Sequence, residues 1–334
     1  MRRILMCRTE KLGGHAWECK KCKHTKIAYY SCKNRSCPQC GWVGVEEWIV
    51  KTTPKILERD HFHMIFSIPE ELNVLWIKNT KLMIHLLFMS VRQTLEKFQK
   101  QELGLKLGVM MNLHTWSRTL NLHPHIHCLI TAGGVDKKGN WHDTGEFLFP
   151  ILGVSKYFRT RFLMLIREHA NELINFDEVN AIIHPLFNKK WNVFISKKYS
   201  HGRGVMKYLA CYVKGGPIKN ERILAYDGIH VTFRYKDHRD NQKKVMTLTV
   251  DEFIRRFIMH FVPKRQRVLR FLGIYATRKN YKAPSPDGDN PIARSFLTLK
   301  PVACPYCKTS MLVHPNLKGS ALLAYKPPDE KLAA

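Results

Sequence analysis

Two pairs of closely spaced cysteines near the amino terminus constrain the fold of this chain more than any other feature. Cys19 and Cys22 form one Cys-x2-Cys pair, Cys37 and Cys40 form another, and fourteen residues separate the two. Two tight turns at this spacing present four thiolates tetrahedrally to a zinc ion. We therefore expect residues 1–45 to form a small zinc-binding module that uses these four cysteines as ligands.

Further cysteines and histidines leave the ligand set open. Those close to the two pairs are Cys7, His15, His24 and Cys32. Some of these residues could replace members of the two pairs as zinc ligands, or they could partly hold a second ion. Alternatively, they could be ordinary packing residues that bind no metal. A third pair, Cys304 and Cys307, lies near the carboxy terminus and could complete a site with the amino-terminal cysteines or with His314, or hold nothing. Because the cytosol keeps thiols reduced, ten cysteines in a cytosolic chain indicate metal ligands rather than disulfides.

The charge of the chain indicates a polyanionic partner. Lys and Arg number 55 and Asp and Glu number 27, so the formal net charge is 55 − 27 = +28. Nucleic acid is the partner that such an excess favours. No apolar run reaches the roughly 18 residues that a membrane-spanning helix needs, and the apolar part of the first residues is too short for a signal peptide. We expect a cytoplasmic protein that is associated with nucleic acid and not with membranes.

The order of expected elements predicts an α+β fold. Apolar runs and helical periodicity alternate as β-α-β-β-α-β, which is the order of a ferredoxin-like antiparallel sheet with helices on one face. The expected strands are 61–68, 105–113, 123–131 and 190–196, and the expected helical stretches are 69–101 and 152–174. A basic hairpin (229–235 with 243–249) and an amphipathic helix (251–262) follow. We expect residues 46–281 to form one domain and residues 282–334 to be a linker and tail that carry the third cysteine pair.

Two residue patterns in this domain indicate chemistry on phosphate. His125 and His127 alternate around an apolar residue, so on a strand both imidazoles leave the same face and can bind one metal ion. Tyr208 and Tyr212 are four apart, which on a helix places one phenol above the other. A metal that polarises a phosphate and tyrosines that attack it are the components of strand transfer through phosphotyrosine. Two histidines leave the ion's coordination incomplete, and the candidates for a third ligand are His63 and His123.

Motifs along almost the whole chain resemble one known family. They are Cys7-Arg8-Thr9, Leu12-Gly13-Gly14-His15, the run from Ser31 to Cys40, the strand with His63, His114-Thr115-Trp116, the run from His123 to His127, Tyr208-Leu209-Ala210-Cys211-Tyr212, and Phe233-Arg234-Tyr235-Lys236-Asp237. In this order and spacing the chain resembles the two-tyrosine HUH transposases of the insertion sequence 91 group, which move DNA by a rolling-circle route.

The resemblance implies a zinc-binding domain followed by an HUH nuclease core. It implies Mg²⁺ or Mn²⁺ on His125 and His127, Tyr208 and Tyr212 as nucleophiles, and single-stranded DNA at transposon ends and target as the partner. The oligomeric state, the DNA sequences and the order in which the tyrosines act stay open. The chain departs from the family's pattern where Cys211 replaces a basic residue and Ser36 a histidine. Cys7 also lies unusually near the start, which predicts an abbreviated or decayed copy.

Other classes of function share parts of these patterns. A replication or conjugation initiator would use the same nuclease chemistry with a different partner. A catalytically decayed zinc-ribbon protein would bind DNA without cutting it. A zinc hydrolase would use metal-bound water as the nucleophile, but no glutamate stands near His123 to His127 to act as its base. The tyrosine pair and the amino-terminal cysteines favour a transposase.

Overall fold

A computed structural model describes most of the chain. The described residues are 2–40, 48, 52, 56–146, 148–173, 176–199, 215–237, 239–276, 303–309 and 311–317, without the side chains of 176, 177 and 312–317. The chain divides into two compact units. Unit 1 comprises residues 1–50, 214–220 and 289–334, and unit 2 comprises residues 51–213 and 221–288.

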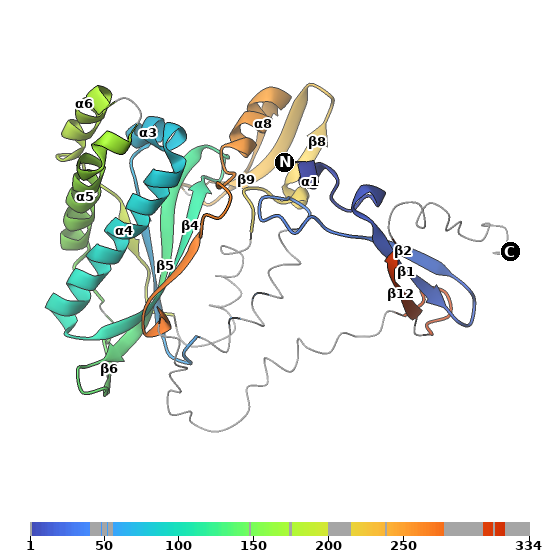
Figure 1. The fold of residues 1–334 in the computed structure, drawn as a ribbon, viewed down its shortest axis with the longest axis horizontal. Helices are drawn as coiled ribbons and strands as arrows, with labels where there is room; N and C mark the ends of the chain where they lie inside the picture. The colour runs from blue at the N-terminus through green and yellow to red at the C-terminus, as the bar shows by residue number, and fades with distance from the viewer. Residues whose placement is uncertain are drawn as a thin grey trace. The chain divides into compact units, whose positions relative to one another are not determined.

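An antiparallel sheet forms the centre of unit 2 (Figure 1). Its strands are β3 (His61–Ser67), β4 (Lys106–Trp116), β5 (Leu122–Val135), β7 (Val193–Ile195) and β11 (Leu269–Gly273), and β6 (Trp141–Asp143) pairs with the end of β5. The strand order is β11-β4-β5-β3-β7. The four expected strands thus lie in the order second, third, first, fourth, which is the ferredoxin-like arrangement. The predicted fold class is confirmed, and β5 is an interior strand, as expected.

Helices cover one face of this sheet (Figure 1). They are α3 (Asn73–Lys78), α4 (Thr80–Phe98), α5 (Ile151–Glu168) and α6 (Phe176–Leu186). Apolar residues at helical spacing turn one side of α4 and of α5 toward the strands, and aromatic rings fill the space between them. Phe158 of α5, for example, packs edge to face on Phe66 of β3 with ring centroids 5.0 Å apart. Strands and helices therefore share a single large apolar core.

A second, smaller sheet in unit 2 carries many basic side chains. Its strands are β8 (Ile223–Tyr226), β9 (His230–Lys236) and β10 (Lys243–Thr249), in the order β10-β9-β8. The expected hairpin is confirmed as β9 and β10, which pair antiparallel from Lys236 with Lys243 to His230 with Thr249. Helix α8 (Val250–Ile258) follows directly, and the Thr249 side chain caps it by accepting a hydrogen bond from the backbone N–H of Glu252.

Unit 1 gathers segments from both ends of the chain. Short helix α1 (Arg2–Leu5) precedes a three-stranded sheet in which β1 (Gly14–Cys19) lies between β2 (Thr25–Tyr29) and β12 (Met311–Leu317) (Figure 1). Gly216 also belongs to this unit. It lies so close to Arg35 that a Cβ at this position would be 2.8 Å from the Arg35 carbonyl oxygen. The described carboxy-terminal residues, 303–309 and 311–317, also belong to this unit, where β12 pairs with β1.

Several short elements were not expected from sequence. They are α6, β6, β8 and β11, and α6 contains a proline, Pro185, near its end. Short edge strands have too few residues to display a period, so their pairing partners define them. None of the helices in the described residues combines the length and apolar character that crossing a bilayer requires.

Candidate metal centres

Three histidines converge on the face of the unit 2 sheet opposite to helices α3, α4, α5 and α6. Along β4 and β5 alternate residues, among them Leu113 and Ile126, enter the helix-covered core, so their neighbours point the opposite way. His114 of β4 is the register partner of His125 on β5, and His127 follows two residues later. One candidate ligand atom from each of the three imidazoles lies within 4.8 Å of the others. Adjacent strands of one sheet thus assemble a three-nitrogen site.

Hydrogen bonds orient two of these rings toward each other. Nδ1 of His125 donates to the carbonyl oxygen of His123 at 2.6 Å, so the neutral ring carries its lone pair on Nε2. That Nε2 lies 3.0 Å from Nε2 of His127. Two neighbouring ligands of an octahedral ion with bonds of about 2.1 Å are about 3.0 Å apart, so the spacing fits a bound divalent cation.

A further pair of side chains holds His127 and His114. Nε2 of His63, on β3, lies 2.8 Å from Nδ1 of His127, so His63 can accept the Nδ1 proton and leave His127 Nε2 free to bind a cation. The Asn112 side-chain amide lies 2.9 Å from Nε2 of His114. The cluster is therefore braced from β3 and β4 as well as from β5.

Burial keeps the imidazoles of His63, His125 and His127 neutral. Desolvation lowers the pKa of His125 to about 3, helped by the nearby His123, and burial lowers the pKa of His63 to about 4. Burial, together with the charges of His114 and other neighbours, holds the pKa of His127 well below its ordinary value. Only a neutral imidazole offers a lone pair to a metal. No proton has to leave these rings at neutral pH before an ion binds.

The sequence predicted part of this centre. The structure brings His125 and His127 together as expected, but the third member of the cluster is His114, whereas His63 and His123 were the candidates. His63 contacts His127 instead, and the His123 carbonyl orients His125. Recognising His114 requires the register of β4 against β5, because this residue sits opposite His125 across the sheet.

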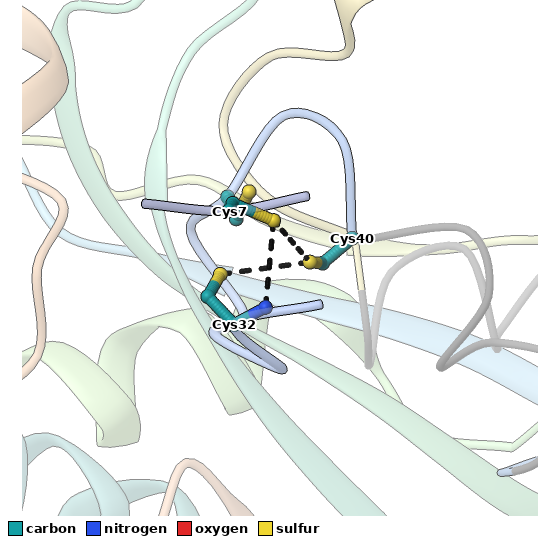
Figure 2. Close-up of side chains that lie close together, drawn as sticks. Cys7, Cys32 and Cys40 are labelled. Atoms are coloured by element: carbon teal, nitrogen blue, oxygen red, sulfur yellow. Dashed lines mark hydrogen bonds between the residues drawn. The ribbon is translucent and has the colours of Figure 1, made fainter. Parts of the chain in front are cut away.

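Four cysteines of unit 1 form the first thiol cluster, and Figure 2 shows three of them, Cys7, Cys32 and Cys40. They are Cys7, Cys32, Cys37 and Cys40, all of them buried. Sγ of Cys40 lies 3.2 Å from Sγ of Cys7 and 3.5 Å from Sγ of Cys32. Burial raises the pKa of Cys40, but hydrogen bonds from Cys7 and Cys32 outweigh it and bring the value to about 7. A compact set of four thiols, one of them readily ionised, suits Zn²⁺.

Four other cysteines of unit 1 form the second thiol cluster. They are Cys19, Cys22, Cys304 and Cys307, and their sulfur atoms also lie within 4.8 Å of one another. The pairing predicted from spacing, in which Cys19, Cys22, Cys37 and Cys40 share one ion, differs from this arrangement. The physical reason is that β1 and β2 separate the two amino-terminal pairs, while β12 brings the distant pair alongside β1. Neither His15 nor His24 belongs to a cluster among the described residues.

Tyr208 and Tyr212 lie outside the residues that the structure describes, within the stretch 201–214. The same holds for Cys211 between them. Their assignment as nucleophiles, and the helix expected to carry them, therefore stay predictions from sequence.

Comparison with known proteins adds three findings. A family model described as a putative transposase matches residues 108–282, and one described as a transposase zinc-binding domain matches residues 1–68. A putative transposase of Sinorhizobium fredii is 33% identical over 294 residues, covering 83% of this chain and 74% of that protein. The transposase for insertion sequence element IS801 of Pseudomonas savastanoi pv. phaseolicola is 28% identical over 349 residues, covering 95% and 83%. No solved structure matches the chain.

Proposed function

Because the chain belongs to the insertion sequence 91 family of transposases, we propose that it cleaves and rejoins single-stranded DNA by a rolling-circle route through 5′-phosphotyrosine intermediates. Family membership makes the chain a DNA-binding transposase with a zinc-binding domain. The proposal adds three points to this: the DNA substrate is single-stranded, tyrosines are the nucleophiles, and a divalent ion other than zinc takes part. The reducing bacterial cytoplasm, which suits the free thiols, is where we propose it works.

The observation that carries the proposal is the cluster of His114, His125 and His127. Three imidazoles on one sheet face can hold a divalent cation, for which the resemblance implies Mg²⁺ or Mn²⁺, with the remaining positions of an octahedral ion left to water and phosphate oxygens. When bound, such an ion polarises a nonbridging phosphate oxygen. His63 and the His123 carbonyl hold the rings of His127 and His125 in orientations that leave a nitrogen lone pair on each for the ion.

Arginines near this cluster suit a phosphate backbone. Arg118 lies close enough for its charge to help lower the pKa of His127. The Arg222 guanidinium donates to the Arg118 carbonyl oxygen at 2.7 Å, and Arg256 donates to the carbonyl oxygen of Thr119 at 3.1 Å. These bonds anchor the loop that follows β4, directly beyond His114. Fixed positive charge beside a metal centre attracts a polyanion and limits where its phosphates lie.

The proposed chemistry needs no external energy source. The phenolic oxygen of Tyr208 or Tyr212 attacks phosphorus, the bond from phosphorus to the 3′-oxygen breaks, and that oxygen leaves as a 3′-hydroxyl after taking up a proton. A 5′-phosphotyrosine bond has then replaced a phosphodiester, so a free 3′-hydroxyl of another strand can reverse the step and join. The second tyrosine permits a second cleavage while the first DNA end is still held.

The test is formation of a covalent adduct between the protein and labelled single-stranded DNA in Mg²⁺ or Mn²⁺. We expect a denaturation-resistant adduct with the wild type. Tyr208→Phe combined with Tyr212→Phe should abolish the adduct while DNA binding, measured by fluorescence anisotropy, persists. Tyr226→Phe, at an exposed position on β8, is the matched control and should behave as the wild type does. An adduct that survives in the double variant would exclude these tyrosines as nucleophiles.

A further inference from the structure

We propose that Cys19, Cys22, Cys304 and Cys307 bind a second structural zinc ion, which fastens the carboxy-terminal strand β12 to the amino-terminal module. The zinc-binding family match ends at residue 68 and the transposase match ends at residue 282. Cys304 and Cys307 lie beyond both. The inference concerns the architecture of unit 1 and does not depend on the proposed DNA chemistry.

The two cysteine pairs have the same local backbone structure. In the first, the N–H of Lys23 donates to the Cys19 carbonyl at 2.9 Å, and the N–H of Cys19 donates to the His24 carbonyl at 2.8 Å. In the second, residues at the same offsets repeat the pattern: Lys308 donates to Cys304 at 3.0 Å, and Cys304 donates to Thr309 at 2.8 Å. Two segments far apart in sequence thus form the same tight turn.

The fourth residue after the first cysteine has a left-handed backbone in both turns. Its φ is 57° at Lys23 and 60° at Lys308, a conformation that costs a lysine free energy because of its Cβ. Such strain persists where the surroundings require it. In both turns the left-handed residue directly follows the second cysteine of the pair, and a shared ion would supply the requirement.

The distances between sulfur atoms are closer to those of a tetrahedral thiolate site than to a disulfide. Sγ of Cys19 lies 3.3 Å from Sγ of Cys307, Sγ of Cys22 lies 3.4 Å from Sγ of Cys304, and Cys22 and Cys307 are 3.7 Å apart. Zinc–sulfur bonds of about 2.3 Å place tetrahedral ligands about 3.8 Å apart. A disulfide would require about 2.05 Å. Two sulfur atoms from each turn therefore supply a full set of four, with no need for His314.

The strands next to the two turns also pair with each other. β12 starts four residues after Cys307 and pairs antiparallel with β1, with Met311 opposite Cys19 and Val313 opposite Trp17. The rings of His24 and Tyr306 also meet edge to face, with centroids 4.7 Å apart. Both turns thus lie at the same end of one sheet, and a zinc ion between them would hold that end together.

Apolar packing around this cluster, among the described residues, is too small to hold the distant segment alone. The buried residues are Cys19, Cys304 and Met311, with Trp17 and Cys307 partly buried against them. The cysteines that meet, Cys22 and Cys304, are 282 positions apart, so the contact closes a very long loop. Binding of a metal ion can offset the entropy cost of closing that loop, whereas so few apolar contacts cannot. It follows that unit 1 is complete only when the carboxy-terminal cysteine pair is present.

The test is zinc stoichiometry by elemental analysis of the full-length, reduced protein. We expect two zinc ions per chain in the wild type and one in the Cys304→Ser/Cys307→Ser variant. Cys128→Ala is the matched control, because Cys128 is a buried cysteine of β5 outside the thiol clusters, and this variant should keep two. One ion per wild-type chain, or two ions in the Cys304→Ser/Cys307→Ser variant, would overturn the proposal.

A second measurement uses the wild type and so does not depend on how a variant folds. We expect iodoacetamide to leave Cys304 and Cys307 unmodified in the zinc-loaded protein and to modify both once a chelator has removed the metal, as read by peptide mass spectrometry. Modification of both residues at the same rate with and without chelator would contradict a shared zinc ion.

Discussion

The histidine centre and the thiol clusters achieve metal-binding geometry in opposite ways. His114, His125 and His127 come from neighbouring strands of a sheet that a large apolar core already holds in place. The thiol clusters have little around them: within the described part of the chain, the first packs only Ile4 and Leu12 against its cysteines. In unit 2 the fold positions the ligands, whereas in unit 1 we expect zinc to stabilise the fold. The difference predicts which part of the molecule fails when metal is removed.

Removal of zinc should have the largest effect, and it should be confined to unit 1. Structural zinc ions contribute about 10–16 kcal/mol in zinc-finger peptides, far more than the few apolar contacts of this unit can replace. After chelation we expect the amides of β1 and β2 to lose their protection in hydrogen exchange, while those of β4 and β5 keep theirs. Equal loss of protection in both units would break the comparison.

Truncation of the core should produce the next largest effect, in unit 2. Phe158 is fully buried and contacts Phe66 and Trp191, with ring centroids 5.0 Å and 5.5 Å away. Phe158→Ala should lower the free energy of unfolding by about 3–5 kcal/mol. Leu152→Ala, on the same helix but 75% exposed, should change it little. Urea denaturation followed by circular dichroism measures both, and zinc content should stay the same in each variant.

Loss of the ring that orients His127 should weaken the histidine centre without unfolding it. His63→Ala removes the partner of His127 Nδ1 and should reduce Mn²⁺ affinity about 10–100-fold. His61→Ala is the control, since His61 lies two residues earlier on the same strand and contacts the Tyr275 hydroxyl instead. Isothermal titration calorimetry compares the two variants. Unchanged Mn²⁺ affinity in His63→Ala would mean that the ion does not bind through His127.

The smallest effect should come from helix α8, which contributes no residue to the main apolar core of unit 2. Thr249→Ala removes the side chain that caps α8, which should cost about 1 kcal/mol. Thr249→Ser keeps the hydroxyl and serves as the control. We expect a slight fall in the midpoint of thermal unfolding for the alanine variant alone. A loss as large as that of Phe158→Ala would place the stability of unit 2 outside its main core.

The histidine centre could be predicted from sequence only in part. The position of His125 and His127 on an interior strand could be predicted, because alternation and element order are local patterns. The role of His114 could not, since it depends on which residue of β4 lies opposite His125. Cross-strand register is set by packing of the whole sheet rather than by spacing along the chain.

The cysteines show more clearly what spacing along the chain cannot predict. Their number and spacing predicted zinc correctly, but spacing alone paired Cys19 and Cys22 with the nearest similar pair. Their partners in the structure lie at the other end of the chain, and the contact exists because β12 pairs with β1. The open alternative, that Cys304 and Cys307 join amino-terminal cysteines, is the arrangement that the structure contains.

Anomalous X-ray scattering from crystals grown with Mn²⁺ tests most directly the claim that the two thiol clusters and the histidine centre are three separate metal sites. We predict two zinc peaks, one within each thiol cluster, and one manganese peak among His114, His125 and His127. A single zinc peak shared by Cys19, Cys22, Cys37 and Cys40, or no manganese at the histidines, would contradict the account.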